Sequence, residues 1–361
     1  MDERGDTAGD MSTLRTGWTT GTCAAAAAKA AAWLLCRSQA VDSVEINLPG
    51  GQTARMNIAF VRATANGAVA GVRKDAGDDP DVTNGSTVVV SVSWQSKGDV
   101  AFFAGEGVGM VTKPGLQIPP GEPAVNPAPR RMIREAIREV TSKPVAVTIS
   151  IPGGRELAEQ TFNPRLGITG GLSILGTTGI VRPRCVKALR DALKCALDVA
   201  GACRVKSPVL VPGNIGAKAA RARFTLSPEQ LVEVSNEWGW ILDQMRSREF
   251  SALLAVGHPG KLAKLANNEW DTHSSNSRRA VLFVRGLAEA LGQALPSPHE
   301  TVEGLFMSLL PAERRKLGTA LAARVRNAIE TRLDRCLPVA VLLVNMQGGE
   351  LGSSGDFESW A

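Results

Sequence analysis

Tyrosine is absent from the sequence of 361 residues, histidine occurs three times and aromatic residues make up only 4%. The lack of tyrosine removes one class of general acid. The histidines, His258, His273 and His299, are too scattered to indicate a metal site. A nucleic-acid surface usually combines a basic groove with stacking aromatic side chains. We therefore expect no protein-bound metal and no nucleic-acid partner.

Long apolar runs are also missing, since none approaches the ~18–20 residues that span a bilayer. The first 17 residues are acidic and lack the apolar segment of a signal peptide. No C-x-x-C pair or zinc-ligand spacing occurs among the cysteines, which we expect to be reduced thiols. The cysteines are Cys23, Cys36, Cys185, Cys195, Cys203 and Cys336. The sequence predicts a cytoplasmic chain without a membrane partner, beginning with a disordered tail over residues 1–14.

What the sequence does contain is typical of a globular protein, with 44% hydrophobic and 21% charged residues. Its length allows two domains on a prior of roughly 100–200 residues each. The net charge of +6 suits an anionic small molecule. The sequence leaves a homo-oligomer open.

The stretch RTGWTTGTCAAAAAKAAA, residues 15–32, organises the first half of the chain. Thr19, Thr20 and Thr22 are residues that cap helix N-termini, and the alanines that follow are the strongest helix formers. One interpretation is an alanine-rich packing helix with an ordinary cap. The other is a site for an anion such as a carboxylate at the helix N-terminus, bound by these threonines.

Alternating apolar residues and glycine turns predict strands over residues 41–49, 53–61, 67–74, 86–94 and 143–152. Between two of them lies an acidic loop, KDAGDDPDVTNG, over residues 74–85. The loop is either a solvated turn segment or a carboxylate cluster that binds a cation or takes a proton. Asp75 or Asp78 is our candidate general base. These elements indicate an α+β domain over residues 15–183.

Two glycine-rich segments interrupt this domain. Gly105, Gly107 and Gly109 follow a short apolar strand and would let a backbone approach a ligand closely, although the dinucleotide fingerprint is not met. Residues 165–183 are rich in glycine, serine and threonine, and fit either a domain linker or a ligand-binding loop. In this segment Thr177, Thr178 and Gly179 are our second candidates for contact with a cofactor.

An amphipathic helix is predicted over residues 130–140. Arg130, Arg134 and Arg138 lie on one face of it at i, i+4 spacing. Such arginines either pair with neighbouring glutamates or face a polyanionic ligand. We take Arg134 as the candidate for the ligand.

From residue 184 onwards the pattern becomes β–α, and three strand–loop–helix units predict a parallel, Rossmann-like three-layer domain over residues 184–361. Ligands bind such sheets outside the carboxyl ends of the strands. This places residues 212–216, 235–237 and 258–261 on one rim. His258 on this rim is either a hydrogen-bonded structural residue or an alternative general base. The whole chain is therefore predicted to be α/β in class.

Six of these segments together resemble the CbiD family, the cobalt-precorrin-5B C1-methyltransferases of anaerobic cobalamin (vitamin B12) biosynthesis. The resemblance covers roughly residues 14–274. Its segments are RTGWTTGTCAAAAAKAAA, KDAGDDPDVTNG, GEGVGMVTKPGL, GITGGLSILGTTGIVRP, VPGNIGAKAA and GHPGKLAKLAN followed by DTHS.

The resemblance implies that S-adenosylmethionine donates a methyl group to C-1 of a cobalt-containing tetrapyrrole, with the cobalt belonging to the substrate. For the methyl donor we favour the loop of Gly105, Gly107 and Gly109, and for the macrocycle the threonines and Arg134. Two other classes stay open. The chain could be a nucleotide-dependent oxidoreductase that uses the Rossmann-like half, or a non-catalytic corrinoid-binding protein.

Overall fold

The computed structural model describes residues 14–183, 185–295 and 299–361. Its contacts divide the chain into two compact units, residues 1–186 and 187–361. The boundary that we predicted between residues 183 and 184 lies close to this division. The predicted tail lies outside the described residues except for Leu14, which is exposed.

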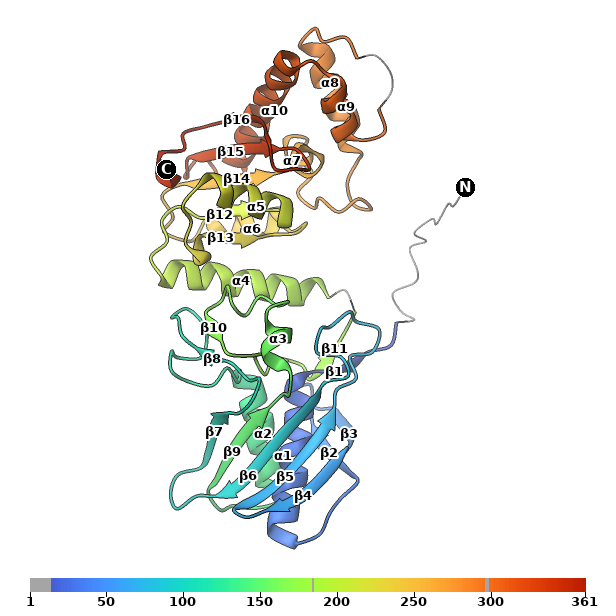
Figure 1. Ribbon diagram of the computed structural model, residues 1–361, viewed down its shortest axis with the longest axis vertical. Helices are drawn as coiled ribbons and strands as arrows, with labels where there is room; N and C mark the ends of the chain where they lie inside the picture. The colour runs from blue at the N-terminus through green and yellow to red at the C-terminus, as the bar shows by residue number, and fades with distance from the viewer. Residues whose placement is uncertain (1–13, 184, 296–298) are drawn as a thin grey trace. The chain divides into compact units, whose positions relative to one another are not determined.

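The first unit contains a five-stranded sheet in the order β4-β5-β6-β9-β7 (Figure 1). Neighbouring strands are antiparallel except β7 and β9, which run parallel. Side chains of β9 alternate strictly between buried and half-buried, as expected of a sheet with one packed face. The strands are β4 (Phe60–Thr64), β5 (Gly67–Arg73), β6 (Thr87–Trp94), β7 (Val100–Ala104) and β9 (Val145–Ser150).

Helices α1 (Thr20–Arg37) and α2 (Pro127–Arg138) pack together, and α1 lies against β5 and β6. Every alanine of α1 is fully buried, as is Cys23. Because an alanine side chain is a single methyl group, the α1 backbone can lie close to the sheet. Helix α1 thus forms part of the buried core of this unit.

Short elements complete the first unit. They are the hairpin β2 (Ser43–Asn47) and β3 (Thr53–Asn57), the pair β1 (Gly17–Trp18) and β11 (Ile180–Val181), the pair β8 (Met110–Val111) and β10 (Ile168–Thr169), and α3 (Gly154–Ala158). The single strand predicted over residues 53–61 is wrong. The chain leaves β3 and enters β4 of a different sheet at residues 58–59, where Ile58 N–H donates to Asp42 and Ala59 N–H to Gly71.

The second unit contains a sheet in the order β13-β12-β14-β15-β16. The first four strands in this order are parallel, and β16 is antiparallel to β15. The strands are β12 (Val209–Val211), β13 (Leu231–Glu233), β14 (Leu253–Gly257), β15 (Val339–Val344) and β16 (Glu350–Ser354). The predicted parallel sheet is confirmed, whereas β16 was not predicted.

Helices cover both faces of this sheet. The helices are α4 (Val186–Ala202), α5 (Asn214–Arg223), α6 (Trp238–Met245), α7 (Pro259–Ala266), α8 (Ala280–Ala290), α9 (Val302–Ser308) and α10 (Pro311–Arg332). Alternate strand residues point to opposite sides. Leu210 and Val341 join a core with α6, α7 and α10, while Val211 and Leu342 join a core with α5. Both the three layers and the predicted α/β class are confirmed.

Candidate functional site

Helix α1 begins at a cap built from threonines. The N–H of Thr22 donates to Oγ1 of Thr19, at 3.1 Å, as the sequence predicts for a helix cap. Thr20 exchanges two hydrogen bonds with the backbone of Leu175, and the Thr22 hydroxyl donates to the carbonyl of Gly179 at 2.6 Å. All three threonines are buried. Their hydroxyls therefore fasten α1 to residues 175–179, and their contact with a macrocycle stays a prediction.

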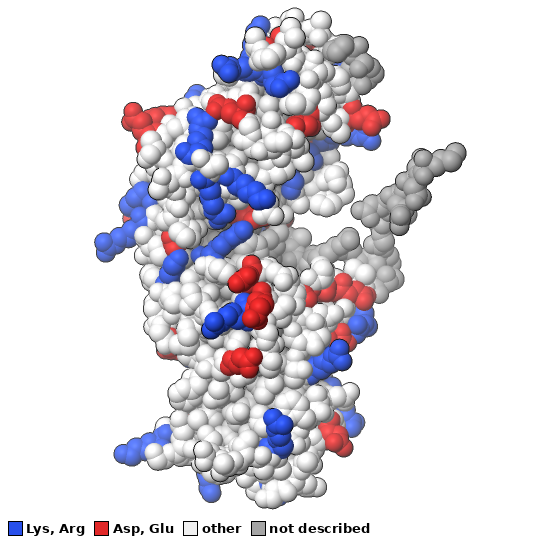
Figure 2. All heavy atoms as spheres, viewed as in Figure 1, with Lys and Arg blue, Asp and Glu red and all other residues white. Residues whose placement is uncertain are grey.

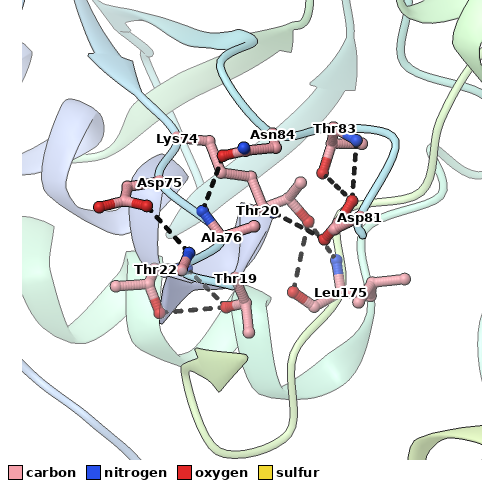
Figure 3. Close-up of polar contacts among 11 residues, drawn as sticks. Thr19, Thr20, Thr22, Lys74, Asp75, Ala76, Asp81, Thr83, Asn84 and Leu175 are labelled. Carbon is pink, nitrogen blue, oxygen red and sulfur yellow. Dashed lines mark hydrogen bonds and ion pairs between the residues drawn. The ribbon is translucent and has the colours of Figure 1, made fainter. Parts of the chain in front are cut away.

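Three segments meet at this end of α1, residues 15–22, 74–84 and 175–181 (Figure 3). The Trp18 N–H donates to the carbonyl of Asp75, and the Thr19 N–H to that of Gly179. Gly17 is required here, because a β-carbon on it would lie 2.1 Å from the carbonyl carbon of Ala76. Three segments that carry the family resemblance are thus joined at one polar junction.

A buried ion pair holds the acidic loop in shape. Lys74 donates from Nζ to Oδ2 of Asp81, at 2.7 Å, and its side chain is only 1% exposed. The other carboxylate oxygen of Asp81 accepts from both the N–H and the hydroxyl of Thr83. Burial of Asp81 opposes its ionisation, but the hydrogen bonds and charge of Lys74 and the bonds from Thr83 outweigh it and lower its pKa.

Both predicted acids of this loop bind Arg15. Asp75 forms an ion pair with the Arg15 guanidinium, and Asp78 accepts from the Arg15 N–H at 2.7 Å. Hydrogen bonds from Arg15 and from the Gly77 N–H lower the pKa of Asp75, so this exposed carboxylate is ionised at neutral pH. A cavity of about 510 Å³ adjoins the pair, with Arg73 and Lys74 also in its wall. The loop therefore presents a mixed basic and acidic surface.

The loop of Gly105, Gly107 and Gly109 packs closely against backbone and side-chain atoms of neighbouring segments. A β-carbon on Gly107 would lie 1.9 Å from the Ile151 carbonyl oxygen, and one on Gly105 would lie 2.1 Å from Oγ of Ser150. Crowding between chain segments thus accounts for these glycines without a ligand. The loop also lines a cavity of about 530 Å³ together with residues 153–156 and 169–170.

The second glycine-rich segment is more open. Thr177 and Thr178 are exposed, and the Thr178 hydroxyl donates to the carbonyl of Ile180. Gly179 is buried with a φ of +83°, and a β-carbon there would lie 2.7 Å from a methyl group of Leu48. Only Gly179 of these three residues takes part in the junction at α1.

The three arginines on one face of α2 all contact other side chains of the protein. The Arg134 guanidinium lies 5.0 Å from the centroid of the Phe102 ring, and its Nε is 3.6 Å from Asp99. Arg130 forms an ion pair with Glu122, and Arg138 pairs with Asp99. The Arg134 side chain is still 42% exposed.

In the second unit, loops gather at the carboxyl ends of β12, β13 and β14. His258 follows β14 and caps α7, because its Nδ1 accepts from the Gly260 N–H at 3.0 Å. Its Nε2 lies 2.9 Å from Oε2 of Glu303. Both ring nitrogens therefore have partners, as in a structural histidine. Asp75 and Asp78 belong to the first unit and His258 to the second.

Comparison with known proteins gives consistent matches. The family model described as CbiD matches residues 7–183. A cobalt-precorrin-5B C(1)-methyltransferase of Syntrophotalea carbinolica is 50% identical over 97% of this chain and 100% of its own length. The chain belongs to the CbiD family. The corresponding protein of Methanocaldococcus jannaschii is 40% identical over 93% of this chain and 95% of its own.

A crystal structure of the cobalamin biosynthesis protein CbiD from Archaeoglobus fulgidus also matches this CbiD chain. It is 32% identical and has a TM-score of 0.39, covering 68% of this chain and 78% of its own. In residues 14–183, 185–295 and 299–361 of this CbiD protein, no three His, Cys, Asp or Glu side chains form a cluster that could hold a metal ion. No helix among those residues is long and apolar enough to cross a bilayer.

Sequence reasoning missed several charged residues of this CbiD protein. Arg15 and Lys74 lie within two of the segments that carry the family resemblance. Their spacing in the sequence does not show that they would pair with the carboxylates of the acidic loop. Glu233 also belongs to this group, at the carboxyl edge of the second sheet, whereas Lys261 lies in the segment that the sequence placed on this rim. A signal for Glu233 existed, because it follows Gly213 by 20 residues at the end of the next strand.

Proposed function

We propose that this chain is a methyltransferase that moves the methyl group of S-adenosylmethionine to C-1 of cobalt-precorrin-5B, giving cobalt-precorrin-6A in anaerobic cobalamin biosynthesis. One observation carries the proposal, namely the 50% identity to a relative of that name over that relative's full length. The matched residues include most of both units.

Methyl transfer from a sulfonium requires alignment more than covalent catalysis. The sulfur–methyl bond breaks as the bond from the methyl to C-1 forms, and S-adenosylhomocysteine leaves. The protein aligns carbon, methyl and sulfur, excludes water, and accepts any proton released. The cobalt is part of the substrate.

The charge distribution supports an acidic substrate. The chain carries a net charge of +6, and on the face shown in Figure 2 basic side chains are dispersed among acidic ones. The cavity beside the acidic loop has Arg15 and Arg73 in its wall, and these two guanidinium groups could bind a substrate carboxylate. Asp75 or Asp78 is the candidate proton acceptor, and His258 is the alternative. These roles, and that of Arg134, stay predictions.

Incubation of the full chain with S-adenosylmethionine and cobalt-precorrin-5B tests the proposal. Mass spectrometry should show a gain of one methylene equivalent that depends on the donor. Tight tetrapyrrole binding without product would instead indicate a corrinoid carrier, and stabilisation by NAD(P)H but not by S-adenosylmethionine would indicate an oxidoreductase. Either result overturns the proposal.

Two substitutions test the residue roles in the same assay. Asp75→Asn should slow methyl transfer without weakening macrocycle binding if Asp75 accepts a proton. Arg134→Ala should weaken tetrapyrrole binding at low salt, and an unchanged affinity would remove Arg134 from the site.

A further inference from the structure

The second unit has the topology of a nucleotide-binding sheet. In its order β13-β12-β14-β15, the chain moves outward from β12 to β13 and then returns to the other side of β12 at β14. Helix α5, which follows β12, packs on one face, and α7, which follows β14, packs on the other. The loops after β12 and β14 therefore diverge, and ligands of such sheets bind in the crevice between them.

A carboxylate lies over the first of these loops. A β-carbon built on Gly213, between β12 and α5, would be 3.5 Å from Oε1 of Glu233, and among the described residues no other atom outside Gly213 and its two chain neighbours lies within 4 Å of that position. The space above the Gly213 turn is therefore open except on the side of Glu233. An acidic residue here, about 20 residues after a glycine turn, is suited to accept hydrogen bonds from the hydroxyls of a ribose.

The next glycine brings the helix close to the sheet. A β-carbon on Gly216, in the first turn of α5, would lie 2.4 Å from the carbonyl oxygen of Val256 in β14. Helix α5 can thus begin directly beside the carboxyl end of β14 only because residue 216 is glycine. Its first N–H groups face the same edge as Glu233.

A lysine supplies the opposite charge. Lys261, in the first turn of α7, donates from Nζ to Oδ1 of Asn236 at 3.0 Å, and Asn236 is held in turn by the hydroxyl of Thr272. Burial and the neighbouring Lys264 lower the pKa of Lys261, while Glu233 opposes this shift. The Lys261 ammonium is thus partly desolvated, and the negative charge of Glu233 acts on it. A second anion, supplied by a ligand, would be stabilised here.

We propose that this edge of the second unit binds the adenosyl donor, with Glu233 accepting hydrogen bonds from the ribose hydroxyls and Lys261 donating to the carboxylate of the methionine moiety. The assignment rests on the proposed function. It locates the donor in the second unit, in place of the loop of Gly105, Gly107 and Gly109 that the sequence suggested.

Calorimetric titration of the full chain tests the assignment with two probes that need no turnover. S-adenosylhomocysteine has both the ribose and the amino-acid carboxylate, whereas 5′-methylthioadenosine has the ribose but no amino-acid carboxylate. Glu233→Gln should raise the Kd for both probes about 10- to 100-fold, the range expected for lost hydrogen bonds to a charged group. Lys261→Met should raise the Kd for S-adenosylhomocysteine by about tenfold and leave that for 5′-methylthioadenosine unchanged.

Two matched controls accompany these variants. Glu106→Gln removes a carboxylate from the cavity at the Gly105 loop, and Lys218→Met removes an exposed lysine of α5. Both should bind each probe as the unsubstituted chain does. Circular dichroism of every variant verifies folding, and Glu233→Asp, which keeps the charge, should recover part of the affinity if Glu233→Gln loses it.

The outcomes separate this inference from the proposed function. If the unsubstituted chain methylates its substrate but Glu233→Gln binds both probes normally, or Glu106→Gln loses them, the inference is wrong and the function stands. If the unsubstituted chain binds NADPH and neither adenosyl probe, the proposed function itself is wrong. Equal losses for both probes in Lys261→Met would also contradict the carboxylate contact.

Discussion

Nζ of Lys74 lies 2.7 Å from Oδ2 of Asp81, and the lysine side chain is almost completely buried. The pair joins the end of β5 to the far side of the acidic loop. Thr83 completes the shell of the carboxylate with two hydrogen bonds. A charge buried to this extent depends on its partner, which makes the loop sensitive to changes at either residue.

Removal of the carboxylate should be the costlier change. Asp81→Ala leaves the Lys74 ammonium buried and unpaired, and we expect a loss of about 3–5 kcal/mol in the free energy of unfolding. Lys74→Met leaves Asp81 with its bonds from Thr83 and with partial exposure, and should cost only about 1–3 kcal/mol. Urea titration of both variants measures the difference. Equal losses would contradict the asymmetry.

The same carboxylate should give the protein an acid-dependent stability. Its pKa is lowered in the folded chain from an ordinary value near 3.8, so its contribution is present above that value and disappears as the pH falls through the lower folded pKa. The stability gap between the unsubstituted chain and Asp81→Asn should therefore narrow below about pH 4. Urea titrations from pH 7 to pH 3 measure the gap. A gap that widens on acidification would contradict the assignment.

Two glycines with similar φ angles separate backbone strain from crowding. Gly107 has a φ of +70°, and a β-carbon added to it would clash with the carbonyl oxygen of Ile151. Gly153 has a φ of +74°, and a β-carbon added to it would meet no atom within 4 Å other than those of its chain neighbours. Gly153→Ala should cost about 1 kcal/mol from strain alone, and Gly107→Ala clearly more, roughly 2–4 kcal/mol. Thermal unfolding of both variants tests this difference in stability. Equal melting temperatures would show that the Gly107 loop shifts to accept the added methyl group at little cost.

The cysteines should differ sharply in reactivity. Burial raises the pKa of Cys23 to about 12, so its thiolate is scarce at neutral pH, while Cys336 is exposed. Iodoacetamide at pH 8 should alkylate Cys336 within the native protein and leave Cys23 unmodified until unfolding. Peptide mass spectrometry identifies the modified residue. Early labelling of Cys23 would show that α1 opens readily.

Periodicity and turn residues predicted most of the fold. Strict alternation in β9 and the repeated β–α pattern of the second half depend on local sequence, so both were visible before the structure. Strand β16 was missed because ELGSS has little apolar character, and its place is fixed by pairing with β15. The division of residues 53–61 between two sheets depends on hydrogen bonds to Asp42 and Gly71, which no local pattern reveals.

The candidate site was less predictable than the fold. The sequence identified Asp75 and Asp78 as chemically interesting, yet the residue that joins them, Arg15, comes from 60 positions earlier. Glu233 and Gly213 meet only because β13 and β12 are adjacent. Side-chain partners brought together by tertiary pairing leave no periodic signal in the chain.

The start of α1 is held to its neighbours partly by main-chain groups, through the Trp18 amide to the Asp75 carbonyl and the Thr19 amide to the Gly179 carbonyl. Peptide groups are common to all amino acids, so these two links survive replacement of the side chains that flank them. Apart from Gly17, which the close approach of Ala76 requires, side chains beside these two links can therefore change without removing the main-chain bonds that set the path of the chain.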